Sequence, residues 1–446
     1  MVALKTAGAR EVLIVGGFVR DQALGVQSKD IDIEVYGLSI EDIMVVLEQL
    51  GMKFDAVGKS FGVIKVGNDI DISVPRRENK IGVGHKGFDI QPDPDMSVKD
   101  AAKRRDFTVN ALAMGVDGNI IDHFSGIEDI QNRILVATSD AFIEDPLRVL
   151  RGMQFAARFD FSVEPRTIAM CGKLASEFST LAKERIWEEW KKWALKGQRP
   201  STGLNFLIDV GWLVLFPEIR ALVGVPQDPE WHPEGDVFIH TGHVVDAAAV
   251  IAEREQLGEH DRLVLLFSAL THDFGKPSTT KFEDGRWRAK RHCGAGVEPA
   301  EQFLEGIGAP KRIIEEVKPL ISEHLAHAGV KVPSDRAIRR LANRIAPSSI
   351  KALSRVVEAD HSGRPPLEKG NPLQLWVDKA HSLNVFSDKP EPILKGRHLI
   401  DMNVKPGRAM GVILDKAFEV QLDGGFSNLA GAQQWAKENM DIYHTN

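Results

Sequence analysis

The stretch Gly16-Gly-Phe-Val-Arg-Asp21, followed by Asp30-Ile-Asp32, decides the fold at the start of this 446-residue chain. The apolar run 12–15 before it predicts a strand, and residues 18–24 predict a helix. Two glycines between a strand and a helix let the backbone approach a phosphate closely, while the helix N-terminus supplies N–H donors. We therefore expect Gly16 and Gly17 to bind a triphosphate.

Aspartates follow this turn at a spacing that suits a metal ion. Asp30 and Asp32 alternate along a second predicted strand, so both carboxylates should lie on one face. Such a pair can hold Mg²⁺, which would activate an attacking 3′-hydroxyl and neutralise a leaving pyrophosphate. Asp71, on a later predicted strand, is our candidate for a third carboxylate. We predict Asp30, Asp32 and Asp71 as catalytic residues, with Asp30 and Asp32 as metal ligands.

Composition limits the classes of protein that the chain can belong to. The formal net charge of −7 argues against a general nucleic-acid coat, although local basic patches occur at 103–105 and 188–199. The two cysteines, Cys171 and Cys293, indicate no disulfide framework and fit a reducing compartment. The sequence contains no apolar run of signal-peptide or membrane-helix length. We expect a cytoplasmic protein that does not contact a membrane.

The pattern of elements divides the chain into an α/β part and several helical parts. Up to about residue 114 strands alternate with amphipathic helices, and after about residue 140 helical periodicity dominates. The stretch 79–97, rich in Gly, Pro and Asp, predicts a long mobile loop, and Ser97 then begins a helix-capping pattern. Breaks at 226–234 and 363–372 predict domains at 1–140, 141–225, 226–365 and 366–446.

Four sequence motifs, taken in their order along the chain, resemble those of a known family. They are Gly16-Gly-Phe-Val-Arg-Asp21, Asp30-Ile-Asp32, Arg104-Arg-Asp-Phe-Thr-Val-Asn-Ala111 and Glu144-Asp-Pro-Leu-Arg148. Together they are similar to the motifs of class II tRNA nucleotidyltransferases with an HD domain and of the related bacterial poly(A) polymerases. The resemblance implies a polymerase-β-like α/β nucleotidyltransferase head, an all-α neck that recognises nucleotides and RNA, an HD-type helical domain and a helical tail.

The same resemblance implies an activity and its partners. The enzyme would add or repair the 3′-terminal CCA of tRNA from CTP and ATP, without a nucleic-acid template and with release of pyrophosphate. Its partners would be tRNA, CTP, ATP and Mg²⁺, and it would act as a monomer or homodimer. The tail segments 392–399 and 405–414 resemble tails of this family, for which tRNA is the expected partner.

Base choice can be predicted from side-chain chemistry. A helix at 146–158 would place Asp145, Arg148 and Arg151 near one face. Cytosine and adenine each present an amine donor beside a ring-nitrogen acceptor, which a carboxylate and a guanidinium can pair, whereas UTP and GTP would leave buried groups unpaired. The resemblance gives this role to Asp145 and Arg148. The alternative for Arg148 is a surface pair with Glu144.

The resemblance also places Arg105 and Asp106 near the ribose and Arg185 at the same nucleotide. The predicted nucleotide-binding residues are Gly16, Gly17, Arg20, Arg105, Asp106, Asn110, Asp145, Arg148, Arg151 and Arg185. We expect the loop 79–97 to govern the switch from CTP to ATP, so that deleting 82–87 impairs A addition more than C addition.

A second constellation lies in the helical region. Histidines and aspartates occur there in the order of an HD metal-hydrolase site, in which divalent ions activate water for phosphoester hydrolysis: His240, His272, Asp273, His324 and Asp360. The stretch Arg291-His-Cys-Gly-Ala-Gly296 departs from the related pattern, because it puts Ala295 at a ligand position, with His292 as a substitute. The site is therefore either a working phosphohydrolase with a second divalent metal or a structural remnant that supports tRNA binding.

Three other functions remain open at this point. Two of them are those of relatives with narrower specificity, namely an A-adding enzyme that works beside a CC-adding one and a poly(A) polymerase. The long loop after Arg77-Glu78 argues against a pure CC-adding enzyme, and Phe61-Gly-Val-Ile-Lys65 looks more like the CCA-adding form than the polymerase form. The third is an HD phosphohydrolase with a vestigial head, which the intact head motifs argue against.

Overall fold

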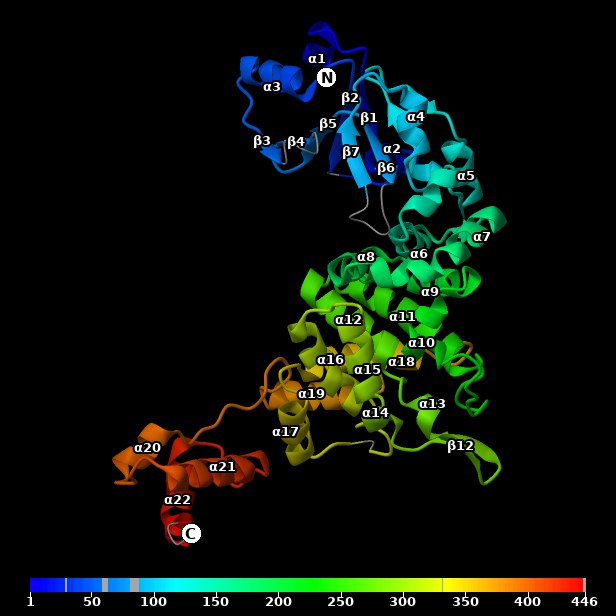
Figure 1. Cartoon of the computed structure of the whole chain (residues 1–446). Coiled ribbons are helices and arrows are strands. Elements are labelled where there is room, and N and C mark those ends of the chain that lie inside the picture. The colour runs from blue at the N-terminus through cyan, green and yellow to red at the C-terminus, as the bar shows by residue number, and fades with distance from the viewer. Residues whose placement is uncertain (29, 58–62, 81–87, 331, 444–446) are drawn as a thin grey trace. The chain divides into compact units, whose positions relative to one another are not determined.

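The chain forms two compact units, Met1–Pro217 and Glu218–Asn446 (Figure 1). This computed structural model describes residues 1–28, 30–57, 63–80, 88–330 and 332–443. The finer division into four domains stays a prediction.

A mixed β-sheet organises the N-terminal part of the first unit. Its described strands follow the order β3-β4-β5-β2-β1-β8-β9, and β2 runs parallel to β5 while the other pairs are antiparallel. The strands are β1 (Glu11–Val15), β2 (Ile31–Tyr36), β3 (Asp55–Val57), β4 (Val63–Val66), β5 (Ile70–Ser73), β8 (Leu112–Met114) and β9 (Ile120–Asp122). The strands predicted at 12–15, 31–35, 63–66 and 69–74 are therefore confirmed to within one residue at most ends.

The two faces of this sheet are covered by different helices. Along β1, Val12 belongs to a core cluster shared with α3 (Ile40–Gln49), whereas Leu13 and Val15 belong to a second cluster on the other face. Residues of α4 (Val98–Lys103) pack against that second cluster. Alternating side chains point to opposite faces of a strand, so a strand that is apolar throughout is buried on both sides. The central position of β1 fixes where the glycine turn after it lies.

The prediction of a loop at 79–97 is wrong at its flanks. Residues Arg76–Lys80 form β6 and Phe88–Pro92 form β7, and the two strands pair antiparallel in a separate two-stranded sheet. Backbone hydrogen bonds make such a ladder, so a stretch with poor strand composition can still pair. Residues 81–87 lie outside the described residues, as does the segment 82–87 whose deletion was considered above. The Ser97 cap is confirmed, because its hydroxyl accepts from the Asp100 N–H at 3.0 Å.

The rest of the first unit is mainly helical. Its remaining elements are α1 (Val2–Thr6), α2 (Gly17–Ala23), η1 (Thr108–Asn110), α5 (Gly126–Asn132), β10 (Ile134–Leu135), η2 (Asp140–Glu144), α6 (Leu147–Phe159), β11 (Ser162–Val163), α7 (Pro165–Lys173), η3 (Ala175–Thr180), α8 (Lys183–Lys196), α9 (Pro200–Asp209) and η4 (Leu213–Leu215). Helix α6 packs against α8 and α9. A Cβ on Gly152 would lie 2.5 Å from Phe206 Cζ, so only glycine permits this approach of α6 to α9.

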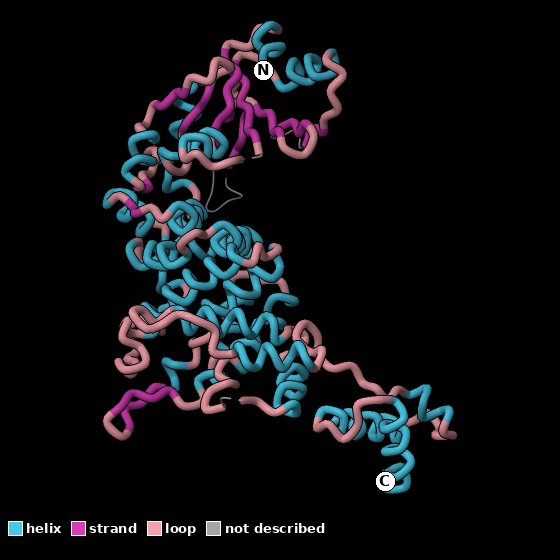
Figure 2. Tube along the Cα trace, turned by 180° about the vertical axis from the view of Figure 1, so that it is seen from behind, coloured by secondary structure: helices cyan, strands magenta, loops and turns pink. Residues whose placement is uncertain are grey.

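The second unit is almost entirely helical. Its elements, after α10 (Pro217–Arg220), are α11 (Val237–Arg254), α12 (Glu259–Thr271), α13 (Lys276–Thr279), β12 (Thr280–Glu283), β13 (Arg286–Ala289), α14 (His292–Ala295), α15 (Val297–Gly306), α16 (Lys311–Glu323), α17 (Asp335–Arg344), α18 (Ile350–Ser362), α19 (Gln374–Ser382), α20 (Gly396–Asp401), α21 (Arg408–Leu422) and α22 (Leu429–Tyr443). Figure 2 shows the β12–β13 hairpin in magenta among these helices. The sequence did not predict this hairpin, because its strands are short and largely exposed.

Helices α11, α12, α16 and α18 pack on one another and form the core of this unit. Helix α12 is buried along most of its length, from Leu263 to Thr271. A helix that is buried on nearly all sides loses the amphipathic pattern of a surface helix. The last segment has a small apolar core of its own around α20, α21 and α22, centred on Leu399 and Ile413. In the described part of the chain, no helix combines the length and apolar character needed to cross a membrane.

Candidate functional site

The glycine turn and the aspartates meet at one end of the sheet in the first unit. Val15 on β1 is the register partner of Asp32 on β2, and Asp32 is the register partner of Asp71 on β5. Partners in a parallel pair project from the same face, so the Asp32 and Asp71 carboxylates are neighbours. Asp30 lies one residue before β2, rather than on the strand as predicted. The structure thus gathers the three predicted catalytic aspartates beside the turn.

Charge accumulates at these carboxylates. Partial desolvation in the cleft raises the pKa of Asp32, Arg105 opposes this rise, and the negative charges of Asp71 and Asp30 add to it. Lys65 Nζ donates to both Asp71 carboxylate oxygens, at 3.0 and 3.1 Å. Carboxylates that repel one another in a partly open site fit a divalent cation, because hard cations take oxygen ligands.

Gly16 brings the backbone close to the positively charged side chain of Arg105. It has φ = 72°, in the left-handed region that glycine adopts without a steric penalty, and a Cβ there would lie 2.5 Å from the Arg105 guanidinium. The N-terminus of α2 follows at Gly17. An anion at this turn would therefore meet both the Arg105 guanidinium and the first N–H groups of a helix.

A buried polar network lies between the turn and helix α6. Asp106 accepts from Arg151 Nε at 2.6 Å, from Asn110 Nδ2 at 2.9 Å and from the Phe107 N–H at 2.8 Å. Burial alone would raise the pKa of Asp106, but the Arg151 charge and these hydrogen bonds outweigh it and lower the pKa to about 2. Arg20 donates to Asn110 Oδ1 and so joins the same network.

Asp21 extends this network to a further arginine. Its carboxylate accepts from Arg20 Nε at 2.8 Å and from Arg158 at 2.9 Å. Both guanidinium groups also lie 4.8 Å from the centroid of the Phe159 ring. The network therefore holds the arginines of α2 and α6 in fixed positions along one side of the cleft.

The predicted base-reading residues are held by local contacts. Asp145 accepts from the Leu147 N–H at 3.0 Å and from Arg185 at 2.8 Å. Arg148 donates to the Ala141 carbonyl at 2.6 Å and to the Arg104 carbonyl at 2.8 Å. Reading a base edge in the predicted way would require these side chains to exchange some of these contacts for contacts to the nucleotide.

One cleft of about 470 Å³ contains most of the predicted head residues. Its lining includes Gly16, Gly17, Arg20, Asp32, Arg105, Asp106, Asn110, Asp145, Arg148, Arg151 and Arg185. Asp30 and Asp71 lie beside it and are not part of the lining. Among the described lining residues, eight are Lys or Arg and three are Asp, so the cleft is basic although the chain is acidic. Such a cleft suits a polyanionic ligand.

Six further described residues that line the cleft were not predicted from the sequence to bind the nucleotide. They are Leu147, Gln154, Phe155, Arg158, Lys192 and Lys196. Arg148, Arg151, Phe155 and Arg158 recur at helical spacing on α6, and Lys192 and Lys196 are four residues apart on α8. Following the helical period from the predicted residues would have found them.

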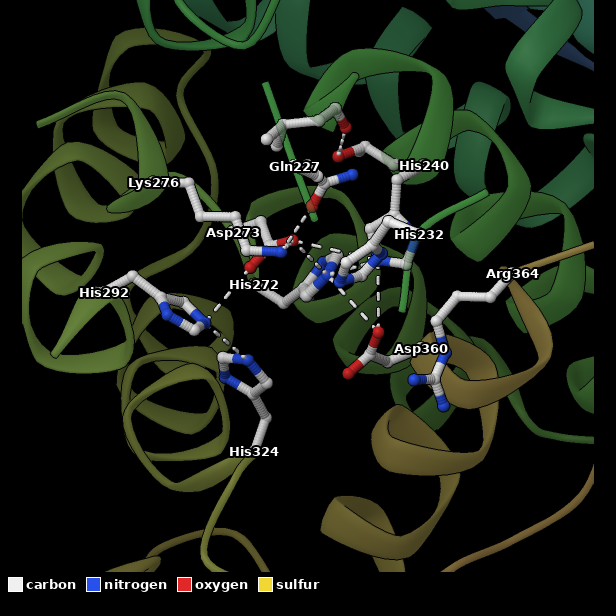
Figure 3. Close-up of polar contacts among 12 residues, drawn as sticks. Gln227, His232, His240, His272, Asp273, Lys276, His292, His324, Asp360 and Arg364 are labelled. Atoms are coloured by element: carbon white, nitrogen blue, oxygen red, sulfur yellow. Dashed lines mark hydrogen bonds and ion pairs between the residues drawn. The ribbon is translucent and has the colours of Figure 1, made fainter. Parts of the chain in front are cut away.

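The histidines of the second unit meet where several helices end (Figure 3). His240 lies in the first turn of α11, His272 and His324 directly follow α12 and α16, and Asp360 is near the end of α18. His292 is the first residue of α14. Because these helices pack together, the predicted residues His240, His272, Asp273, His324 and Asp360 form one buried cluster that includes His292.

The proton positions in this cluster follow from the backbone. The Nδ1 atoms of His272, His292 and His324 lie 2.8, 2.7 and 2.7 Å from the carbonyl oxygens of Ala269, Ala289 and Ile321. A carbonyl only accepts, so each Nδ1 carries a proton, and in the neutral form of such a ring the Nε2 lone pair is available to a metal ion. Second-shell bonds of this kind orient metal-binding histidines.

Two of these lone pairs face each other, because His292 Nε2 lies 3.3 Å from His324 Nε2. His272 Nε2 lies 3.3 Å from His240 Nε2, but His240 also pairs with the carboxylates of Glu234 and Asp360, at 2.7 and 3.1 Å. Burial opposes protonation of His240, but these hydrogen bonds outweigh it and raise its pKa to about 9, so its Nε2 must lose a proton before it can bind a metal ion. Burial lowers the pKa of His324 to about 4, so its ring is neutral at pH 7. Two unprotonated nitrogens cannot bond each other, but they can bind one cation together. The donor set therefore fits divalent metal ions.

The buried Asp273 and the partly exposed Asp360 complete the cluster. Asp273 is 1% exposed, with Oδ2 3.1 Å from His272 Nε2 and Oδ1 3.3 Å from His292 Nε2. Although Lys276 Nζ lies 2.7 Å from Oδ2, neither Asp273 oxygen accepts a well-aligned hydrogen bond from the described residues. Asp360 Oδ1 lies 3.1 Å from His240 Nε2. Lys276 supplies a positive charge to Asp273 Oδ2, whereas Oδ1 of Asp273 has no such partner among the described residues and is available to a further cation.

The structure places His292, the predicted substitute for a ligand at Ala295, in the cluster. His292 lines the cavity of about 240 Å³ together with Asp273, His324 and Asp360, and its Nε2 lies 3.3 Å from Asp273 Oδ1. Ala295 is exposed and does not line this cavity. That Ala295 stands where relatives have a ligand stays a prediction.

Three family models match successive parts of the chain. The Poly A polymerase head domain matches residues 12–136, the probable RNA and SrmB-binding site of polymerase A matches 160–222, and the HD domain matches 237–357. The Multifunctional CCA protein of Vibrio parahaemolyticus is 36% identical over 370 residues, which cover 80% of this chain and 87% of that protein. The Multifunctional CCA protein of Psychromonas ingrahamii is 35% identical and covers 86% of this chain and 93% of that protein.

Solved structures share the fold at lower identity. The Bacillus stearothermophilus CCA-adding enzyme in complex with CTP has a TM-score of 0.65 and 21% identity, and covers 99% of this chain and 97% of that chain. The Thermotoga maritima CCA-adding enzyme complexed with tRNA has a TM-score of 0.55 and 18% identity, and covers 95% of this chain and 90% of that chain. The predicted fold, an α/β head followed by helical domains with an HD domain, is confirmed.

Proposed function

This chain belongs to the CCA-adding tRNA nucleotidyltransferases, and from that membership we propose that the cleft in its first unit adds CMP and AMP to the 3′ end of tRNA. One observation carries the proposal. A single cleft of about 470 Å³ is lined both by Asp32, at the catalytic end, and by Asp145 and Arg148, the predicted base-reading residues. Its volume lies in the range of small-ligand sites.

The catalytic end would hold the metal and the phosphates. Asp32 and Asp71, with Asp30 nearby, would hold one or two divalent ions, for which Mg²⁺ is our proposal. When bound, the metal would activate the attacking 3′-hydroxyl and neutralise the pyrophosphate. Gly16, Gly17 and Arg105 would bind the triphosphate through backbone N–H groups and a guanidinium.

The α6 end would select the base. Asp145 would accept from the exocyclic amine of cytosine or adenine, and Arg148 would donate to the ring nitrogen beside it. Asp106, Asn110 and Arg151 would form a fixed wall at the ribose, because the buried Asp106 carboxylate holds both Asn110 and the partly exposed Arg151 by hydrogen bonds. The local contacts of Asp145 and Arg148 hold the two side chains in place until a nucleotide replaces some of them. That 82–87 governs the change from C to A addition stays a prediction about residues outside the described ranges.

The test is the length of the product. The protein and Mg²⁺ are incubated with tRNA transcripts that lack CCA, end in CC, or are complete, with each nucleotide alone and with CTP and ATP together. We expect addition of CCA, addition of A to the CC end, and no extension of the complete end. Addition of A only to the CC-ended transcript would identify an A-adding enzyme, and long A tracts a poly(A) polymerase. No transfer at all would overturn the proposal.

A second function is favoured by the facing Nε2 atoms of the second unit. We infer that this cluster holds divalent metal and hydrolyses phosphoesters, with His240, His272, Asp273, His292, His324 and Asp360 as the candidate ligands. When bound, the metal would supply an activated water. Lys276 and Arg364, which line the cavity, would bind the phosphate charge.

Metal content and hydrolysis test this second function together. The metal-free protein is loaded separately with Mg²⁺, Mn²⁺, Zn²⁺ and Co²⁺, its bound metal is counted, and release of phosphate from nucleotide monophosphates is measured. Asp273→Asn should lose both metal and hydrolysis. Retained hydrolysis in Asp273→Asn would contradict the assignment. That the protein acts in the cytoplasm, as a monomer or homodimer, stays a prediction.

A further inference from the structure

Cys293 lies beside the histidine cluster and has no part in the functions proposed so far. Its Sγ lies 3.8 Å from His292 Nε2 and 3.9 Å from His324 Nε2. His292, Cys293 and His324 form one of the groups of side chains in the described chain whose ligand atoms could hold a metal ion together. The thiol is half-buried and faces the same two nitrogens whose lone pairs face each other.

The distances among His292 Nε2, His324 Nε2 and Cys293 Sγ are close to those among three ligands of one tetrahedral ion. Nitrogen and sulfur ligands bind Zn²⁺ at about 2.0 and 2.3 Å, which separates two such donors by roughly 3.3 to 3.6 Å in a tetrahedron. The separation of the two nitrogens is 3.3 Å, and those from each nitrogen to Sγ are 3.8 and 3.9 Å. A shift of a few tenths of an ångström in the thiol would complete three corners of the tetrahedron.

Asp273 independently indicates an ion at this place. It is 1% exposed, and although Lys276 pairs with Oδ2 at 2.7 Å, Oδ1 accepts no hydrogen bond from the described residues and lies 3.3 Å from His292 Nε2. This oxygen would occupy the fourth corner. The other oxygen, Oδ2, lies 3.1 Å from His272 Nε2 and therefore belongs to the neighbouring half of the cluster.

We propose that Cys293 is a metal ligand, which makes this half of the cluster a mixed site of two imidazoles, one thiolate and one carboxylate. The proposal rests on the metal-binding function inferred above for the cluster. Thiolate favours borderline and soft ions over Mg²⁺, so this half should take Zn²⁺, Co²⁺ or Ni²⁺. The other half, with His240, His272 and two carboxylates, has no sulfur ligand among the described residues and should discriminate less among ions.

Co²⁺ spectroscopy tests the ligand directly, because only a thiolate bound to Co²⁺ gives an intense sulfur-to-metal charge-transfer band in the near ultraviolet. The full-length protein is stripped of metal and titrated with Co²⁺, and bound metal is counted in parallel. The variants are Cys293→Ser and Cys293→Ala. Cys171→Ala is the matched control, since it removes the other cysteine, which lies on α7 in the first unit.

We expect a charge-transfer band in the wild type and in Cys171→Ala, and its loss in both Cys293 variants. Zn²⁺ affinity should also fall by at least about tenfold in these variants, because even second-shell partners are worth 10- to 100-fold. Co²⁺ bound without the band, or a band that survives Cys293→Ser, would overturn the thiolate ligand and leave the histidine–aspartate site standing. Failure of the wild type to bind Co²⁺ would overturn both.

Discussion

The cleft of the first unit and the histidine cluster of the second are both suited to phosphoester chemistry, but they differ in the groups that they present. The cleft is rich in cationic side chains, whereas the cluster is rich in carboxylates and imidazoles that can bind cations. The cleft is lined by eight cationic and three anionic described residues, and it is open to solvent around Asp32. The cluster is largely buried and brings the Nε2 atoms of His292 and His324 together with the carboxylates of Asp273 and Asp360. The first site is therefore completed mainly by an anionic substrate, and the second by cations.

The largest expected effect concerns the aspartates of the cleft. Asp71→Ala should lower nucleotidyl transfer at least about a thousandfold, because loss of a metal ligand removes several kcal/mol of transition-state stabilisation. Asp69→Ala is the matched control, since Asp69 is exposed and precedes β5. Single-turnover rates of C addition would measure both. Equal losses in the two variants would mean that Asp71 has no special role.

A smaller effect is expected in base choice. Arg148→Ala should reduce the preference for CTP over UTP by about 10- to 100-fold, because the donor to the ring nitrogen is lost. The ratio of kcat/KM for the two nucleotides measures this. Arg166→Ala, which removes an exposed arginine on α7, should keep the wild-type ratio. An unchanged ratio in Arg148→Ala would remove this residue from base selection.

Stability should respond to Asp106 over a defined pH range. Its folded-state pKa of about 2 lies below the ordinary value of 3.8, so the ionised carboxylate stabilises the fold by about 2 kcal/mol above pH 4. This contribution should disappear as the pH falls from about 4 towards 2. Denaturant unfolding of the wild type and Asp106→Asn at several pH values would show the difference narrowing. A difference that does not change with pH would contradict the assigned cause.

The smallest effect concerns the helix that leads to Arg105. Ser97→Ala removes the side-chain cap of α4 and should cost about 1 kcal/mol. Thermal unfolding measures this loss. Metal retention by the second unit should be unchanged, because the cap lies within the first unit. Reduced metal retention in this variant would show that the two sites are coupled.

The sequence predicted most of the cleft because many of its residues lie on regular elements, while Gly16, Arg105, Asp106 and Asp145 lie in short motifs between them. Helical spacing on α6 and strand alternation at Asp32 place side chains from sequence alone. The prediction from sequence failed where the position of an element depends on residues that are distant in the sequence. The pairing of β6 with β7 is a backbone ladder, and the β12–β13 hairpin consists of short, largely exposed strands, so neither was predicted.

Contacts that depend on the exact positions of atoms could not be predicted from the sequence either. Nothing in the pattern indicates that Arg148 donates to the Ala141 carbonyl, or that Cys293 faces His292 and His324. The tautomers of the histidines likewise depend on carbonyls that the folded helices position. The types and order of the residues were enough to predict two sites. The hydrogen-bond partners and facing ligand atoms at each site became visible only in the folded structure.

The central claim is that the two units carry separate sites with separate chemistry. Nucleotidyl transfer to a CC-ended transcript and phosphoester hydrolysis are measured on the same preparations of the wild type, Asp32→Ala and Asp273→Ala. The account predicts a crossed result, in which Asp32→Ala loses only transfer and Asp273→Ala loses only hydrolysis and bound metal. Loss of both activities in either correctly folded variant would contradict it.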